Sequence, residues 1–300
     1  MDVMIQNLVA NGYNEDEVID LISYDSNDID TISDNVLALD SSYCVPKSNP
    51  TAIYIGGQPG AGKSILSMAI KKSSPNFVEI AMDNYRTYHP NYERIEECVK
   101  EHWKNRSLSE NDSPGNDIAH FTHSFSGEMI DAIIEKATNK KYDVVIEWNL
   151  KEPYQPLESM KDLKNKGYNI NVWSLAVSKD ISSSAYKMRA DIMNDYGHIM
   201  RRVSKNFHDS CIESLPDSLD YLKDNGLKRD VINQLCVVDR AGKCLWDKTS
   251  SGYPGDILSE KINESIKNAA IYNNVDFAKV SFLREVEGLK QLSLTDAVHK

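Results

Sequence analysis

From residue 51 onward, short apolar segments alternate with amphipathic ones. The apolar segments are rich in β-branched residues and have the length of buried strands; they lie at 51–55, 77–82, 142–146, 171–177, 235–239 and 244–246. Between them, apolar residues recur at helical spacing in 65–72, 91–123, 124–136, 182–195 and 198–214. Strands that alternate with helices predict an α/β fold, a parallel sheet flanked by helices on both faces.

The first 46 residues predict three short amphipathic helices. Asn14, with Glu17 as its partner, is the predicted N-cap of the second helix, and Ser26 or Asn27 begins the third. The apolar stripes are Met4, Ile5, Leu8 and Val9; Val18, Leu21 and Ile22; and Ile29, Ile32, Val36 and Leu37. So small a bundle has a marginal core of its own, and we expect it to lean on the rest of the chain.

These patterns divide the chain into three expected parts. Residues 1–46 form an acidic three-helix module, 47–257 form the main domain, and 258–300 form a polar helical extension. Residues 41–50 carry two prolines and are the predicted linker between the first two parts.

The segment TAIYIGGQPGAGKS, residues 51–64, carries the spacing G-x-x-x-x-G-K-S between a predicted strand and a predicted helix. In that context the glycines let backbone N–H groups approach phosphate oxygens, and the helix N-terminus adds partial positive charge. We expect Lys63 to reach the β- and γ-phosphates of ATP and Ser64 to hold Mg²⁺. The predicted ATP-binding residues are Gly57, Gln58, Pro59, Gly60, Ala61, Gly62, Lys63 and Ser64.

Two of the predicted strands end in a carboxylate, at Asp83 and at Glu147. Ligands of open α/β sheets bind at the carboxyl ends of the strands, so both side chains are expected beside the phosphate loop. Asp83 is then placed to accept a proton from a substrate hydroxyl or to help hold the metal. The alternative for Asp83 is a helix N-cap.

The helices predicted after the fourth strand carry Arg189, Arg201 and Arg202. A planar guanidinium that is always charged suits a phosphoryl group in transfer, so these arginines are candidates for a phosphate clamp. The alternative is that each is a surface residue.

The acidity of the chain is confined to its beginning. Of its 45 acidic residues, ten lie in residues 1–46, which contain no Lys or Arg. The remainder of the chain therefore contains 35 acidic and 34 basic residues. The acidic positions are Asp2, Glu15, Asp16, Glu17, Asp20, Asp25, Asp28, Asp30, Asp34 and Asp40. A nearly neutral body without a basic stripe argues against a nucleic-acid partner.

Composition and cysteine usage predict a cytoplasmic protein. Hydrophobic residues make up 41% and charged residues 26%, as in globular proteins, and no apolar run is long enough for a membrane span. The N-terminus lacks the features of a secretory signal. The five cysteines are widely spaced, which favours reduced thiols.

Several motifs, taken in order, resemble the zeta toxin family over roughly residues 51–250. These are GGQPGAGKS, Asp83-x-x-Arg86 with His89-Pro90, VVIE ending at Glu147, and LAVSK followed by Arg189, Arg201 and His208-Asp209. The resemblance implies a P-loop kinase that uses ATP and Mg²⁺ to phosphorylate the 3′-hydroxyl of the sugar of UDP-N-acetylglucosamine. Such an activity interferes with cell-wall synthesis.

The resemblance also implies a role for each matching residue. Asp83 is the base, Arg189 and Arg201 clamp the phosphates, and Arg202 is the alternative second clamp. The implied sugar-nucleotide site contains Asp83, Arg86, Asp131, Glu147, Asn149 and Lys151. Asp131 stands where the family has Glu, and Trp148, Asn149 and Lys151 stand where it often has Gly-Thr and a nearby Arg; Lys lacks the two-pronged grip of Arg.

Three other interpretations compete with this one. A guanine-reading Asn-Lys-x-Asp is absent, since 139–143 has one residue too many, which excludes a GTPase switch. A kinase for another hydroxylated metabolite or nucleotide is the enzymatic alternative. The turn at Asn11-Gly12-Tyr13 also resembles the loop of ubiquitin-associated domains, which suggests a host-directed effector whose first 46 residues bind ubiquitin.

Zeta toxins usually require a separate helical antitoxin that blocks the ATP site, and here an acidic helical segment precedes the kinase on the same chain. A linker of about ten residues spans at most ~35 Å, and tethering gives a local concentration on the order of millimolar. Carboxylates of residues 1–46 would mimic ATP phosphates towards Lys63 and the arginines. The resulting hypothesis is an antitoxin in cis that restrains the kinase; the alternative is a solvated acidic face.

Overall fold

A computed structural model describes residues 3–107, 113–175, 177–195, 199, 201–240 and 244–249. The predicted C-terminal extension, 258–300, lies outside the described residues. Among the described helices, none combines the length and the apolar character that a membrane crossing requires.

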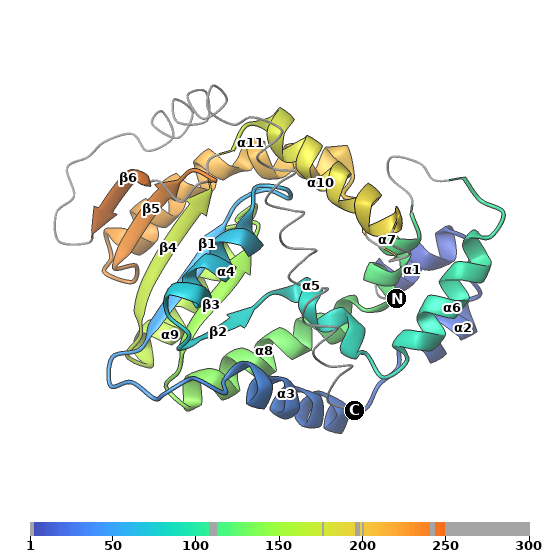
Figure 1. Cartoon of the computed structure of the whole chain (residues 1–300), viewed down its shortest axis with the longest axis horizontal. Helices are drawn as coiled ribbons and strands as arrows, with labels where there is room; N and C mark the ends of the chain where they lie inside the picture. The colour runs from blue at the N-terminus through green and yellow to red at the C-terminus, as the bar shows by residue number, and fades with distance from the viewer. Residues whose placement is uncertain are drawn as a thin grey trace.

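The core of the fold is a six-stranded sheet with the strand order β2-β3-β1-β4-β5-β6 (Figure 1). Strands β2, β3, β1, β4 and β5 are parallel, and β6 is antiparallel to β5. The strands are β1 (Thr51–Gly56), β2 (Phe77–Ile80), β3 (Asp143–Trp148), β4 (Asn169–Leu175), β5 (Gln234–Val238) and β6 (Cys244–Thr249). The predicted α/β fold with a parallel sheet is confirmed.

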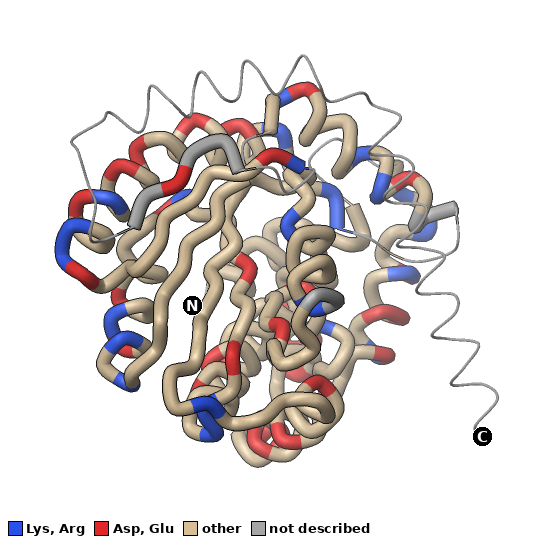
Figure 2. The backbone as a smooth tube through the Cα atoms, turned by 60° about the vertical axis from the view of Figure 1, so that its left-hand side comes forward, with Lys and Arg blue, Asp and Glu red and all other residues tan. Residues whose placement is uncertain are grey.

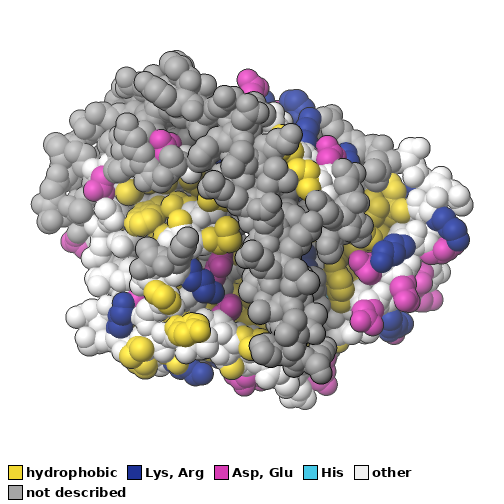
Figure 3. Space-filling model, in the orientation of Figure 1, with side chains coloured by type: hydrophobic (Ala, Val, Ile, Leu, Met, Phe, Trp, Pro, Cys, Tyr) yellow, Lys and Arg dark blue, Asp and Glu magenta, His cyan; other side chains and the backbone are white. Residues whose placement is uncertain are grey.

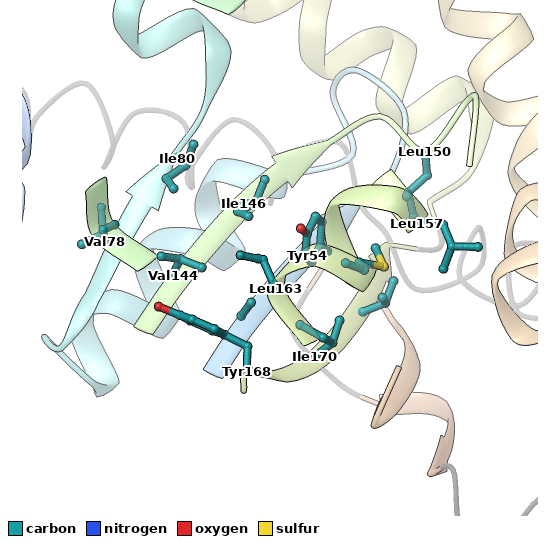
Figure 4. Close-up of a cluster of buried hydrophobic side chains, with 14 of the residues drawn as sticks. Tyr54, Val78, Ile80, Val144, Ile146, Leu150, Leu157, Leu163, Tyr168 and Ile170 are labelled. Atoms are coloured by element: carbon teal, nitrogen blue, oxygen red, sulfur yellow. The ribbon is translucent and has the colours of Figure 1, made fainter. Parts of the chain in front are cut away.

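Helices cover both faces of the sheet because side chains alternate along each strand. In β1, Tyr54 enters one apolar cluster, whereas Ile53 and Ile55 enter the other. Figure 4 shows the larger cluster, in which side chains of β1 to β4 meet Leu157 and Leu163. Its helices are α3 (Ser26–Asp40), α5 (Met82–Tyr85), α8 (His123–Asn139), α9 (Tyr154–Asn165), α11 (Lys205–Leu222) and η2 (Lys223–Leu227); the opposite face is covered by α4 (Lys63–Ser73) and α10 (Lys179–Asp195).

A third apolar core lies beyond the end of the sheet, where four helices form a separate lobe (Figure 1). The helices are α1 (Val3–Ala10), α2 (Glu15–Ile22), α6 (Tyr92–Trp103) and α7 (Pro114–Phe121), with η1 (Arg86–Tyr88) leading into α6. The buried residues are Leu8, Tyr13, Val18 and Leu21 from the N-terminal side, and Ile95, Val99, Ile118 and Phe121 from the other.

The three N-terminal helices form as expected, but they do not share a core. The side chain of Asn14 caps α2 by accepting a hydrogen bond from Glu17 N at 3.1 Å, and Asp25 with Asp28 forms a capping box for α3. Helices α1 and α2 complete the lobe, whereas α3 packs on α8 in the larger core. The segment therefore packs against the rest of the chain, as its small size predicted, and contributes to two cores instead of one of its own.

Four local expectations need correction. The segment 91–123 contains two helices, α6 and α7, and α11 begins at Lys205 rather than at residue 198 because Ser204 caps it. Helix α9 was not predicted at all. Asp83 lies in the first turn of α5, just beyond the end of β2, instead of on the strand.

Charged residues lie mainly on the outer helices and loops, while the strands are mostly uncharged (Figure 2). On the described part of the face in Figure 3, Lys and Arg side chains are scattered among acidic and hydrophobic ones and form no continuous stripe. The carboxylates Asp143 and Glu147 on β3 are exceptions to this pattern, and Glu147 lies at the end of the sheet that carries the phosphate loop.

Candidate active site

The phosphate loop connects β1 to α4 in a conformation that only glycine adopts easily. Gly60 has φ 76° and Gly62 has φ 103°, both in the left-handed region. A β-carbon at Gly60 would also lie 2.1 Å from Ser182 O of α10. Lys63 Nζ folds back over the loop and donates to the carbonyl oxygens of Gly57 at 2.9 Å and Gln58 at 3.3 Å. The loop therefore has the cradle shape that phosphate binding requires.

Gln58, predicted to bind ATP, uses its side chain to anchor the loop. The side chain is buried, and its Nε2 donates to Val177 O at 2.7 Å and to Ser182 Oγ at 3.2 Å. Ser182 Oγ in turn lies 2.9 Å from His208 Nε2, and His208 Nδ1 lies 3.1 Å from Asp209 Oδ1. The His208-Asp209 pair thus belongs to a polar network that fixes the loop to α10 and α11.

Glu147 lies beside the predicted metal ligand. Ser64 Oγ donates to Glu147 Oε2 at 3.5 Å, while the buried Oε1 has no partner among the described residues. Burial raises the pKa of Glu147 to about 7, although Lys63 opposes this shift. Glu147 stands on β3, directly next to Ile55 of the phosphate-loop strand. The carboxylate therefore faces the nucleotide side of the site.

The residues fit a magnesium ion that is shared with phosphates. Mg²⁺ takes oxygen ligands and usually binds through one or two protein groups, with substrate phosphates and water completing its shell. Ser64 Oγ and the unpartnered Glu147 Oε1 supply that kind of donor set. The described residues contain no group of three or more His, Cys, Asp and Glu side chains suited to a metal, so a dedicated protein cage is not found there.

Asp83 faces the crevice and is held by Arg86. The Asp83 side chain is 70% exposed, and its Oδ1 accepts a hydrogen bond from Arg86 Nε at 2.8 Å. Partial loss of water raises the pKa of Asp83, but Arg86, Arg201 and Arg189 together outweigh it, so the pKa lies below its usual value. Arg86 itself is 8% exposed, and its Nη1 donates to the backbone and side chain of α7 and its cap. The observed contacts of Arg86 therefore join Asp83 to α7 and its cap.

Two of the clamp candidates, Arg189 and Arg201, lie within electrostatic range of the site residues. Arg189 acts electrostatically on Lys63, Asp83 and Glu147, and Arg201 acts on Asp83. Arg202 is instead engaged by α10, because its Nη2 donates to Asp191 Oδ1 at 2.9 Å. The geometry therefore favours Arg201 over Arg202 as the second arginine.

The remaining predicted substrate residues divide into two groups. Lys151 Nζ lies 5.6 Å from the ring centre of Phe207, and the guanidinium of Arg201 lies 5.9 Å from the same ring centre, so both cations pack against Phe207. Asn149 Oδ1 accepts from Lys151 N at 2.9 Å and shapes the turn after β3. Asp131 lies apart, in a surface hollow of about 380 Å³ between α8 and α9. Its electrostatic neighbour among the described residues is Glu128, on the same helix.

Two residues near the site were missed by the sequence analysis. Arg240 follows β5, and its Nε would lie 3.5 Å from a β-carbon at Gly62, so the guanidinium covers the start of α4. His120 of α7 has a buried Nδ1 without a partner in the described part of the chain and lies within electrostatic range of Arg201 and Arg86. The strand-end position of Arg240 was a usable signal, whereas the position of His120 depends on how α7 packs.

The parallel sheet and the glycine loop at the end of β1 define the class, a P-loop protein with a kinase-like fold. The family model described as Zeta toxin matches residues 34–251, more than half of the chain. The chain therefore belongs to the zeta toxin family, as its motifs predicted. Helices α1 and α2 lie outside the matched residues.

Curated relatives agree with this assignment. Toxin zeta of Enterococcus hirae is 30% identical over 227 residues, which cover 74% of this chain and 73% of the relative. Toxin PezT of Streptococcus pneumoniae serotype 4 is 26% identical over 216 residues, which cover 70% of this chain and 77% of the relative.

Solved structures show the same fold. A structure from the study of the PezAT chromosomal toxin-antitoxin system of Streptococcus pneumoniae has a TM-score of 0.65 at 19% identity, covering 87% of this chain and 98% of that chain. A structure of AvrRxo1-ORF1:-ORF2 with ATP has a TM-score of 0.50 at 12% identity, covering 87% and 76%. At these identities the likeness concerns the fold alone.

Proposed function

We propose that the chain is an ATP-dependent kinase that transfers the γ-phosphoryl group to the 3′-hydroxyl of the sugar of UDP-N-acetylglucosamine. The observation that carries the proposal is the charge arrangement around Asp83. An exposed carboxylate lies within electrostatic range of the phosphate-loop Lys63, of Arg189 on α10 and of Arg201 in the segment before α11. Phosphoryl transfer requires this combination of an acceptor-orienting carboxylate and convergent positive charge.

Each residue has a distinct task in this proposal. The loop N–H groups and Lys63 bind the β- and γ-phosphates, and Ser64 with Glu147 would hold Mg²⁺, which neutralises developing charge when bound. Asp83 accepts a hydrogen bond from the acceptor hydroxyl and orients it for in-line attack. Arg189 and Arg201 stabilise charge on the transferring group.

The choice of acceptor rests on membership of the zeta toxin family. Lys151 and Asn149 replace residues that the family often uses next to its sugar-nucleotide site, so another hydroxylated metabolite or nucleotide is the second candidate. ATP and UDP-N-acetylglucosamine are metabolites of the cytoplasm, which makes the cytoplasm the proposed place of action and cell-wall synthesis the proposed target.

ADP release with UDP-N-acetylglucosamine, compared with other UDP-sugars, dinucleotides and an antibiotic, tests the acceptor. UDP-N-acetylglucosamine is expected to support the highest kcat/KM. Asp83→Asn is expected to lower kcat by roughly 10²–10⁴-fold with little effect on ATP affinity, because only the acceptor loses its orienting partner. A higher kcat/KM for another acceptor would contradict the sugar proposal, and collapse of ATP affinity in Asp83→Asn would assign Asp83 to metal binding instead.

The hypothesis that residues 1–46 restrain the kinase receives no support from the ion pairs of the described residues. Asp20 pairs with Arg94, Asp30 and Asp34 pair with Lys136, and Asp40 pairs with Lys71. None of these pairs includes Lys63, Arg189 or Arg201. We infer that a restraining partner, if the chain has one, is a separate antitoxin, as in the toxin-antitoxin system named for the pneumococcal structure.

A further inference from the structure

Asp117 of α7 joins the N-terminal hairpin, defined as α1, α2 and the turn between them, to the kinase body. The residue is 2% exposed, and its carboxylate accepts three hydrogen bonds. The donors are Asn11 Nδ2 at 3.1 Å, Tyr13 Oη at 2.8 Å and Trp103 Nε1 at 2.6 Å. A buried carboxylate is costly unless it is hydrogen-bonded, so these donors fix the place of Asp117.

Aromatic packing reinforces the same joint. The ring of Tyr13 stacks on His102 of α6 with 3.8 Å between ring centres and meets Phe121 of α7 edge-on at 5.3 Å. Arg106 Nη1 also donates to Asn11 O at 2.9 Å. The hairpin turn is therefore held by α6, by α7 and by Arg106, which follows α6.

The C-terminal end of α7 holds the residue that fixes Asp83. Ala119 O, two residues after Asp117, accepts from Arg86 Nη1 at 2.9 Å, and Thr122 Oγ1 accepts from the same atom at 3.1 Å. The Nε of that guanidinium donates to Asp83 Oδ1 at 2.8 Å. A planar guanidinium cannot keep both sets of contacts if α7 moves relative to Asp83.

We propose that the N-terminal hairpin positions Asp83 for phosphoryl transfer, with Asp117 and Arg86 as the positioning residues that connect them. This inference rests on the proposed function of Asp83. Under this inference residues 1–22 support activity and do not inhibit it, because loosening the hairpin lowers the rate of turnover. Neither α1 nor α2 is part of the segment that matches the family model.

Two tyrosines provide a matched pair of variants in the full chain. Tyr13→Phe removes the hydroxyl that binds Asp117 and keeps the ring. Tyr24→Phe is the control. It removes a hydroxyl that donates to Glu128 Oε1 of α8 at 2.7 Å. This hydrogen bond spans as many residues in sequence as the one between Tyr13 and Asp117, but it includes neither Asp117 nor Arg86. We expect Tyr13→Phe to lower kcat about fivefold with KM for ATP unchanged, and Tyr24→Phe to retain wild-type kcat.

Amide hydrogen exchange without ATP measures the coupling between the hairpin and the Asp83 segment independently of turnover. Exchange at residues 82–88 is expected to be about fivefold faster in Tyr13→Phe than in wild type, while exchange in β1 and in Tyr24→Phe stays unchanged. Asp117→Asn should show the same pattern more strongly. Faster turnover in Tyr13→Phe, or unchanged exchange at 82–88 in both Tyr13→Phe and Asp117→Asn, would overturn the inference. Absence of turnover in wild type with every acceptor would contradict the proposed function, and the exchange pattern would still decide the link.

Discussion

Asp83 remains charged at neutral pH because Arg86, Arg201 and Arg189 lower its pKa despite partial loss of water. A carboxylate with a low pKa is a weak base. That suits a loose phosphoryl transfer, in which the acceptor proton need not leave before the phosphoryl group begins to move. Orientation of the acceptor hydroxyl is then the main contribution of Asp83.

The neighbouring residues Arg201 and Arg202 give an internal comparison at the same scale. Arg201→Ala should lower kcat on the order of 10²-fold, since it removes a charge that acts on the transferring group. Arg202→Ala should leave kcat within about twofold, because the guanidinium of Arg202 is held in a partly exposed ion pair with Asp191. Steady-state rates at saturating ATP and acceptor measure both. A larger loss from Arg202→Ala would reverse the assignment.

Glu147 predicts a pH dependence of stability in the ligand-free chain. Its pKa of about 7 lies above the value of the unfolded chain, mainly because of burial. Its contribution to stability is complete below the unfolded pKa and is lost as the pH rises through about 7. Glu147→Gln should therefore be more stable than wild type at pH ~8 by on the order of 2 kcal/mol and gain nothing at pH ~4. Urea unfolding without Mg²⁺ measures this, and equal differences at both values would contradict it.

At the scale of elements, the phosphate loop and α10 form one packed unit. Gly60 leaves no room for a β-carbon against Ser182 O and has positive φ. Gly60→Ala should lower stability by about 1–3 kcal/mol and weaken ATP binding, because loop and helix must separate. Gly127 of α8 has nothing within 4 Å of its β-carbon position, so Gly127→Ala is the control and should be neutral or stabilising. Thermal unfolding and calorimetric ATP titration distinguish them; similar losses in both would argue against a specific contact at Gly60.

The sequence predicted the elements whose local signal agrees with their packing. The centre of β3, from Val144 to Ile146, is apolar and β-branched, and α2 is capped by Asn14, so both could be found from the chain alone. Helix α9 was missed because Pro156 stands in its first turn and its exposed side is polar. For Asp131, motif order predicts a position along α8 but not the direction of the side chain, and the structure places Asp131 at a hollow between α8 and α9.

At the scale of the whole molecule, charge count was a poor guide to the N-terminal segment. Ten carboxylates without a base suggested a phosphate mimic. The structure shows that several of them pair with surface Lys and Arg, while the apolar positions of the same helices enter two different cores. Composition reveals that a segment is acidic, but only the fold reveals which partners its carboxylates meet.

Removal of residues 1–46 should therefore destabilise the chain instead of activating it. The truncation would expose Ile95, Val99, Ile118 and Phe121, all at most 5% exposed in the full chain. Burying one such side chain contributes about 1.5–3 kcal/mol, so the four together are comparable with the whole stability of a typical domain. Circular dichroism and growth of expressing cells compare the two chains. A folded, more active and more toxic truncated chain would restore the hypothesis of restraint in cis.

The proposed function depends on a phosphoryl transfer from ATP to a sugar hydroxyl. Mass spectrometry of a nucleotide-sugar mixture, after incubation with the full chain, ATP and Mg²⁺, tests it most directly. We predict that UDP-N-acetylglucosamine gains the mass of one phosphoryl group, that NMR places the group on the 3′-oxygen, and that Lys63→Ala forms no product. An unmodified mixture, with ATP consumed or not, would contradict the claim that this site is a UDP-N-acetylglucosamine kinase.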